Sequence, residues 1–296
     1  PVPELESAAD SSEDTVPGGR LHVRLGRPQE LSQAWSGPAS PPVRAAAVVD
    51  DSSWTAERGA AGDLRMDHEL CRFHLSSDGS LLRCAPANQY APAWRRLLLD
   101  TALVTVSLSR GIDALHAGCV VIDGGAIAIA GATGAGKTTL TLELVRRGAD
   151  FLADDVVALT PRGDDVLAQP GPPVANVPAA ETGDDVAERM HLIRGEWWSR
   201  VRSPRRAPAP LRAVVVLEPA GASSTGSAVS RLRDPAATLL AHALHSGSAP
   251  ERRARRFSLL AGVAQRAAVL RVSRSDLTSP AALAEQVIAA VPPGPP

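Results

Sequence analysis

Residues 131–138 of this 296-residue chain have the sequence Gly131-Ala132-Thr133-Gly134-Ala135-Gly136-Lys137-Thr138. This stretch matches the phosphate-loop pattern G-x-x-x-x-G-K-[ST]. An apolar run at 126–130 precedes it and predicts a strand, and apolar spacing at 138–147 predicts a helix that ends at Gly148. A strand, this loop and a helix, in that order, form a typical binding site for nucleotide phosphates.

The residue types in the loop suit phosphate chemistry. Glycines let successive backbone N–H groups turn inward around phosphate oxygens, and the positive end of the helix dipole faces the same point. Lys137 is expected to reach the β- and γ-phosphates, and the Thr138 hydroxyl is expected to bind Mg²⁺. We therefore expect ATP and Mg²⁺ as ligands. The expected nucleotide-binding residues are Gly131, Ala132, Thr133, Gly134, Ala135, Gly136, Lys137, Thr138 and Thr139.

Lys137 is the single lysine among the 31 basic residues, and this narrows the class of protein. A GTPase would need a second lysine for its Asn-Lys-x-Asp guanine motif. A transporter ATPase would carry a Leu-Ser-Gly-Gly-Gln type signature, which the sequence lacks. In RecA-like and helicase-like cores, the apolar strand that ends in an aspartate lies much further from the phosphate loop in the sequence. Here an apolar strand is predicted directly after the helix, over 151–159, and it contains Asp154 and Asp155.

The order of motifs around the loop resembles the catalytic domain of the HPr kinase/phosphorylase family, whose fold is related to phosphoenolpyruvate carboxykinase. That family has a His-Gly pair, a hairpin, the phosphate loop, a helix ending in Arg-Gly, and Ala-Asp-Asp. This sequence has His116-Ala117-Gly118, a predicted hairpin over 115–130, the loop, Arg147-Gly148 and Ala153-Asp154-Asp155. The likeness covers Leu115 to Leu159.

The resemblance implies a fold and a set of catalytic roles. The implied fold is α/β: a P-loop kinase core of the HPr kinase/PEP carboxykinase-like type, a mixed sheet with flanking helices, plus a β-rich N-terminal part. Asp154 would be the general base. Asp155 would bind Mg²⁺ together with Thr138. His116 would lie beside the transferred phosphoryl group, and Lys137 would complete the catalytic set.

Two departures from the family pattern bear on the substrate. The family loop usually continues Gly-Lys-Ser-Glu, whereas Thr138 and Thr139 stand here. The later family signature Glu-Ile-Arg-Gly is matched only by Leu192-Ile193-Arg194-Gly195, with leucine in place of a metal-associated glutamate. Both changes argue against phosphorylase activity and against HPr as the substrate. The chain is more similar to stand-alone relatives, some of which phosphorylate a serine on a precursor peptide.

The expected function is therefore an ATP- and Mg²⁺-dependent kinase that phosphorylates a serine or threonine hydroxyl of a peptide or small protein. A small-molecule alcohol kinase on the same core is the first alternative, and a non-catalytic ATP-binding regulatory module is the second. The arginines at 194–206, near Trp197 and Trp198, either contact substrate or form a solvated loop. Arg252, Arg253, Arg255 and Arg256 are expected to form a solvated helix face.

Charge and composition limit the other partners. The net charge of −1 gives no reason to expect nucleic acid or an anionic membrane surface. No apolar run reaches the roughly 18 residues that a membrane span needs. Residues 1–19 contain five acids and no base, the wrong charge for a targeting peptide. Three cysteines without metal-ligand spacing favour a reducing compartment, so we expect a cytoplasmic protein, with oligomerisation left open.

Composition and periodicity divide the chain into four parts. Residues 1–20 are expected to form a disordered acidic tail. Residues 21–90 form a β-rich N-terminal region with a hairpin-type turn at 77–79. Residues 91–291 form the catalytic domain, which begins with a helix over 92–108. The proline-rich residues 292–296 are expected to be disordered.

Overall fold

The computed structural model describes residues 19–40, 44–49, 52–180, 185–218, 228–244, 250–273 and 279–292. The expected α/β class is confirmed, because several sheets alternate with helices along the chain. The two predicted tails fall almost entirely outside the described residues. The chain divides into two compact units, with the boundary between Ile112 and Asp113. None of the helices in the described ranges is long and apolar enough to cross a membrane.

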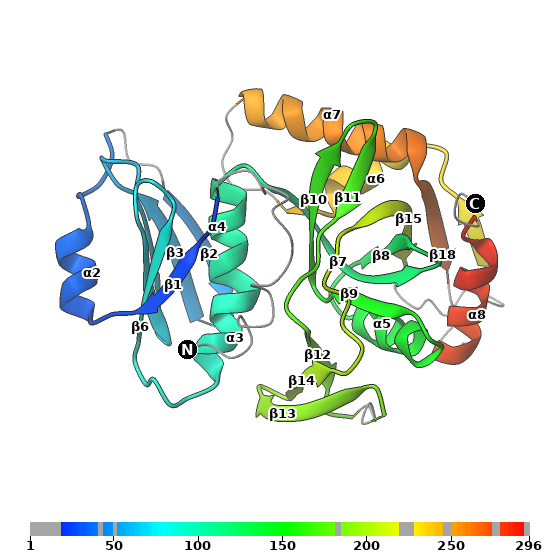
Figure 1. Cartoon of the computed structure of the whole chain (residues 1–296), viewed down its shortest axis with the longest axis horizontal. Coiled ribbons are helices and arrows are strands. Elements are labelled where there is room, and N and C mark those ends of the chain that lie inside the picture. Colours follow the sequence, from blue (N-terminus) through cyan, green and yellow to red (C-terminus); the bar gives the residue numbers. More distant parts are fainter. Residues whose placement is uncertain are drawn as a thin grey trace. The chain divides into compact units, whose positions relative to one another are not determined.

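Unit 1, the part before residue 113, contains a six-stranded sheet (Figure 1). In spatial order its strands are β1 (His22–Leu25), β6 (Leu81–Pro86), β5 (Cys71–Leu75), β4 (Leu64–His68), β3 (Ser52–Arg58) and β2 (Arg44–Val49). β1 runs parallel to β6, and the remaining neighbours are antiparallel. The hairpin expected around 77–79 is the β5–β6 connection.

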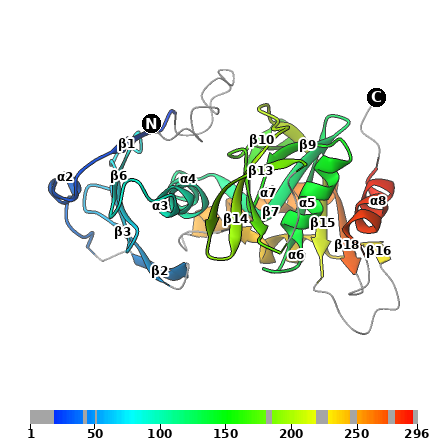
Figure 2. The same ribbon diagram turned by 90° about the horizontal axis from the view of Figure 1, so that it is seen from below.

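Helices lie on both faces of this sheet (Figure 2). On one face lies α2 (Pro28–Ala34); on the other lie α3 (Ala93–Leu97), a π-helical turn η1 (Leu98–Ala102) and α4 (Leu103–Ser109). Trp94, Leu98 and Val106 are buried in one core with Met66 and Phe73 of the sheet. The predicted boundary at residue 90 is therefore wrong: the helix over 92–108 belongs to unit 1, because its apolar stripe packs against the first sheet.

Unit 2 is built on a nine-stranded mixed sheet. The main path runs β11 (Asp165–Ala168), β10 (Val156–Arg162), β7 (Asp113–Ile122), β8 (Gly125–Gly131), β15 (Ala209–Leu217), β18 (Ala268–Ser273) and β16 (Ala228–Arg231). Two short strands, β9 (Asp150–Ala153) and β17 (Ala243–Leu244), also pair with β7. The predicted hairpin is confirmed as β7–β8, which turns at Asp123 and Gly124 with φ of 48° and 74°.

Two layers of helices enclose the sheet of unit 2 (Figure 1). On one face, Ile127 and Ile129 of β8 pack in a core with α5 (Lys137–Arg146) and α8 (Pro280–Ala290). On the other face, the small side chains of Ala126 and Ala128 belong to a core that includes α6 (Pro235–Ala241) and α7 (Pro250–Arg266). β8 is therefore buried on both faces, as a central strand next to a parallel neighbour should be.

A separate three-stranded antiparallel sheet, here called the arm sheet, is inserted between β11 and β15. It consists of β12 (Val174–Pro178), β14 (Glu196–Val201) and β13 (Ala187–Ile193), with β14 in the middle. The β13–β14 hairpin turns at Arg194 and Gly195, where φ is 51° and 82°. The stretch that resembles the Glu-Ile-Arg-Gly signature is thus the tip of this hairpin.

Candidate active site

The phosphate loop connects the end of β8 to the start of α5, as the motif predicts. Gly131, Gly134 and Gly136 have φ of 153°, 78° and 90°, a region that favours glycine. A Cβ at position 131 would lie 2.8 Å from the Leu217 carbonyl oxygen, whereas one at 134 would meet nothing within 4 Å. The loop is therefore tightly packed where it leaves the sheet and open at Gly134.

Lys137 lies inside the loop and is only 8% exposed. Its Nζ donates to the carbonyl oxygens of Gly131 (3.2 Å) and Ala132 (3.3 Å). Burial lowers the pKa of this ammonium group, and the carboxylates of Asp155 and Asp154 act in the opposite direction. Lys137 is therefore close enough to Asp154 and Asp155 for their charges to affect its pKa.

The two acids lie at a break in the sheet. The single strand expected over 151–159 is wrong, because β9 ends at Ala153 and β10 begins at Val156. Both strands pair with β7, and Asp155 adopts a left-handed backbone conformation with φ of 65° between them. Such a conformation is costly for a residue other than glycine, and it is found disproportionately at functional sites.

The break gives the two carboxylates different partners. The Thr138 hydroxyl donates to both oxygens of Asp154, at 3.0 and 3.2 Å, and the backbone N–H of Asn176 donates to Asp154 Oδ2 at 3.1 Å. His116 Nδ1 lies 3.2 Å from Asp155 Oδ1. All the predicted catalytic and metal-binding residues therefore lie together. However, Thr138 contacts Asp154, whereas the resemblance paired it with Asp155.

A second histidine, His242, lies next to His116. Helix α6 ends at Ala241, and β17 then pairs with β7 at Ala114 and Leu115. The His242 carbonyl accepts the backbone N–H of His116 at 2.8 Å. Burial lowers the pKa of the His242 ring, and the positive charges of His116 and Lys137 lower it further.

Gly118 explains why the His-x-Gly pattern of β7 needs its glycine. A Cβ at this position would lie 2.3 Å from Thr141 Oγ1 and 3.6 Å from Asp154 Oδ1. The Thr141 hydroxyl itself donates to the Lys137 carbonyl at 2.8 Å within the first turns of α5. The missing side chain therefore lets α5, with Lys137 and Thr138 at its start, pack closely against β7.

Sequence reasoning missed Asn176 and His242. Asn176 lies 22 residues after Asp154 in the arm sheet, and His242 follows α6. Neither belongs to a motif or a periodic pattern, so no local signal marks them. Both reach the site only through strand pairing and loop packing.

Some of the tryptophans and arginines at 194–206 are buried or paired with other residues, and the others are exposed on the surface. Trp198 is fully buried, and Trp197 is half-buried with the Arg189 guanidinium 5.2 Å from its ring centre. Arg205 pairs with Asp150 at 3.5 Å, and Arg202 donates to the Asp185 carbonyl. Arg200 and Arg206 are exposed.

The oxygen donors at the site fit Mg²⁺. Within the described part of the chain, no three His, Cys, Asp or Glu side chains cluster so as to hold a metal ion by themselves. Mg²⁺ prefers oxygen ligands and commonly takes only one or two protein carboxylates, with phosphate oxygens and water completing its shell. Thr138 and Asp154, which are in hydrogen-bond contact, therefore offer oxygen donors of the kind that Mg²⁺ takes from a protein.

Comparison with known proteins adds little to this geometry. No protein-family model matches the chain, and no curated protein matches it. Among solved structures, the Hpr(Ser) kinase/phosphatase from Coxiella burnetii matches with a TM-score of 0.32 and 12% sequence identity, covering 60% of this chain and 94% of that chain. A likeness at this level carries no argument about activity. The resemblance to HPr kinase/phosphorylase therefore depends on the motif residues.

Proposed function

We propose that this chain is a kinase that uses ATP and Mg²⁺ to phosphorylate a serine or threonine hydroxyl of a peptide or small protein. One observation carries the proposal: the adjacent acids Asp154 and Asp155 lie beside a phosphate loop and contact Thr138 and His116, respectively. Two neighbouring carboxylates next to a triphosphate repel it unless a divalent cation lies between them. This combination suits phosphate transfer, because the loop can hold the phosphates, one acid can bind Mg²⁺ and the other can accept the proton of the substrate hydroxyl.

The loop and helix α5 bind the nucleotide in this proposal. Backbone N–H groups of the loop and the positive end of α5 hold the phosphates. Lys137 leaves the loop carbonyls and pairs with the β- and γ-phosphates. Bound Mg²⁺ would neutralise the charge that develops on the phosphates.

The two acids divide the remaining tasks. The contact with the Thr138 hydroxyl favours Asp154 as the carboxylate next to Mg²⁺. That leaves Asp155, oriented by His116, to accept the proton from the substrate hydroxyl. The hydroxyl oxygen forms a bond to the γ-phosphorus, the bond from that phosphorus to the β,γ-bridging oxygen breaks, and ADP leaves. This assignment reverses the one that the family resemblance implies.

Phosphate transfer can be tested directly with γ-labelled ATP, Mg²⁺ and host-cell extract, using the Asp154→Asn protein as the control. We expect label to enter a peptide or protein fraction with the wild-type chain only, since both acids are needed. Label confined to small metabolites would replace the proposal with a small-molecule kinase. Equal, negligible transfer by both proteins, with ATP binding retained, would leave only a regulatory ATP-binding module.

His242 is expected to contribute to transfer through its position beside His116 and Lys137. His242→Ala should lower kcat roughly 10-fold, because it removes a half-buried imidazole ring whose pKa shows that it interacts electrostatically with His116 and Lys137. The dissociation constant for ATP should stay within about twofold of wild type. His22→Ala, at an exposed position of β1, is the matched control. Unchanged kcat in the His242 variant would show that only its backbone matters.

A further inference from the structure

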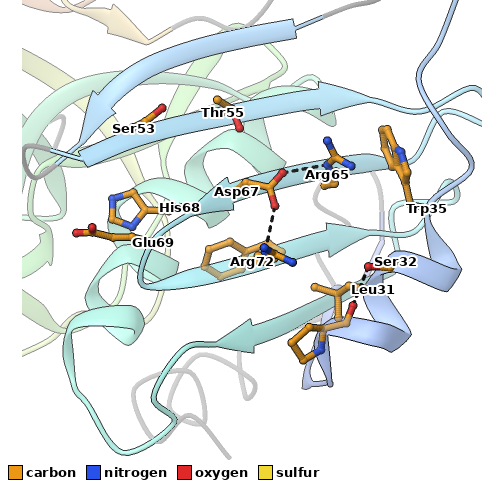
Figure 3. A pocket seen from close by; sticks show the side chains of 12 residues that line it. Leu31, Ser32, Trp35, Ser53, Thr55, Arg65, Asp67, His68, Glu69 and Arg72 are labelled. Atoms are coloured by element: carbon orange, nitrogen blue, oxygen red, sulfur yellow. Dashed lines mark hydrogen bonds and ion pairs between the residues drawn. The ribbon is translucent and has the colours of Figure 1, made fainter.

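A cavity of about 560 Å³ lies in unit 1, and none of the residues that line it belongs to the candidate active site. It opens over strands β3, β4 and β5, next to α2 (Figure 3). Side chains alternate between the two faces of a sheet. Trp54, Met66 and Phe73 belong to the core shared with α3 and α4, so Thr55, Arg65, Asp67 and Arg72 lie on the opposite face. The cavity floor is therefore polar.

The two arginines on this floor differ in the ion pairs that they form. Arg65 contacts Glu57 at 3.1 Å and Asp67 at 3.0 Å, and its guanidinium lies 4.9 Å from the Trp35 ring centre. Among the described residues, Arg72 has one ion-pair contact, to Asp67 at 3.8 Å, and its side chain is 62% exposed. Figure 3 shows Asp67 between these two arginines. Arg72 is thus the cation of this floor that can bind a further anion.

The rest of the lining suits an extended chain. Ser53 and Thr55 present exposed hydroxyl groups at alternate positions of β3. Pro28, Leu31 and Trp35 form an apolar wall at α2. A volume of this size lies within the usual range for ligand-binding pockets. An apolar wall beside a strip of hydroxyl groups and one available guanidinium matches a peptide that carries apolar and acidic side chains.

The charge balance selects a carboxylate over a phosphate group. Arg72 can bind a carboxylate through two parallel hydrogen bonds. A phosphate dianion would need a second available cation, but Arg65 is already held between two acids. Asp67 and Glu69 also line the cavity and would repel a dianion. A single carboxylate is the anion that this site matches.

We propose that the unit 1 cavity binds a short extended segment of the peptide or protein substrate, with an acidic side chain on Arg72 and a neighbouring apolar side chain against Trp35 and Pro28. The identity of the bound chain as substrate rests on the proposed kinase function. All the candidate catalytic residues lie in unit 2, so this segment is separate from the phosphorylated hydroxyl. Binding it raises the effective concentration of that hydroxyl for the kinase site.

Peptide binding can be measured without catalysis. The probe is the blocked peptide acetyl-Leu-Asp-Leu-Asp-Leu-amide, followed through the indole N–H signals of the full-length protein in NMR, with Trp35→Phe used for assignment. We expect a saturable shift of the Trp35 signal. Replacing the Asp residues of the peptide with Asn, or Arg72 of the protein with Gln, should weaken binding at least tenfold. Arg24→Gln, an exposed arginine of β1, should leave binding unchanged.

Three results would overturn the inference: no saturable shift, equal binding of the Asn peptide, or full displacement of the peptide by equimolar inorganic phosphate. The outcome is independent of the kinase assay. Peptide binding without phosphate transfer would leave this site standing and remove the proposed function. Phosphate transfer without peptide binding would leave the proposed function standing and remove this binding site. Once the substrate is known, Arg72→Gln should raise its KM at least tenfold without changing the KM for ATP.

Discussion

Asp155→Asn is expected to lower kcat about 10²–10⁴-fold, the contribution typical of a positioned general base. The amide keeps the shape of the carboxylate but cannot accept the proton of the substrate hydroxyl. ATP binding should persist, because the loop and Lys137 are unchanged. Titration with a fluorescent ATP analogue checks binding, and single-turnover transfer checks chemistry. Lys137→Ala is the contrasting variant, since it should lose nucleotide binding itself.

Asp154→Asn should also remove most activity, but in a way that depends on Mg²⁺. This carboxylate contacts the Thr138 hydroxyl, so its loss should raise the Mg²⁺ concentration needed for half-maximal transfer at least tenfold. The Asp155 variant should keep the wild-type Mg²⁺ dependence. If the Mg²⁺ requirement instead moves with Asp155, the two acids have the roles that the family resemblance implies. Wild-type rates in both variants would contradict the kinase proposal.

Arg256→Ala is expected to destabilise unit 2 by about 3–5 kcal/mol, the usual loss when one partner of a buried ion pair is removed. Arg256 Nε lies 3.2 Å from Asp113 Oδ1, and the two side chains are only 9% and 11% exposed. The variant leaves the Asp113 carboxylate buried without its cation at the start of β7. Urea denaturation followed by circular dichroism measures the change in the free energy of unfolding.

The neighbouring Arg255 supplies the control for this measurement. It lies on the same helix but is exposed, so Arg255→Ala should change the free energy of unfolding by less than about 0.5 kcal/mol. Replacing both Arg256 and Asp113 with leucine should recover much of the loss, because no buried charge then remains. Equal effects of the two single alanine variants would show that the Arg256–Asp113 pair does not stabilise unit 2.

The Arg256 pair also shows where composition misleads. Four arginines within five positions were expected to form a solvated face, yet α7 turns Arg256 inward toward Asp113, 143 residues earlier in the chain. Position on a helix determines which of several identical residues faces the sheet. The buried partner of Arg256 becomes visible only when α7 is packed against the sheet of unit 2.

The boundary between the two units also differs from the one that the sequence predicts, because it lies between Ile112 and Asp113 and not at residue 90. The apolar spacing over 92–108 correctly predicted a helix, since periodicity reports which face is apolar. Periodicity does not report which sheet covers that face. Trp94 and Leu98 pack with Met66 and Phe73, so the helix completes the core of unit 1.

The sequence by itself determined the phosphate loop, the β7–β8 hairpin before it and helix α5 after it, because each depends on neighbouring residues and on local backbone preferences. The tertiary structure alone decided that Thr138 contacts Asp154, that His116 contacts Asp155, and that Asn176 and His242 join them. Those contacts depend on the break between β9 and β10 and on the pairing of both strands with β7. Strand pairing joins residues that are distant in sequence, and no local pattern encodes it.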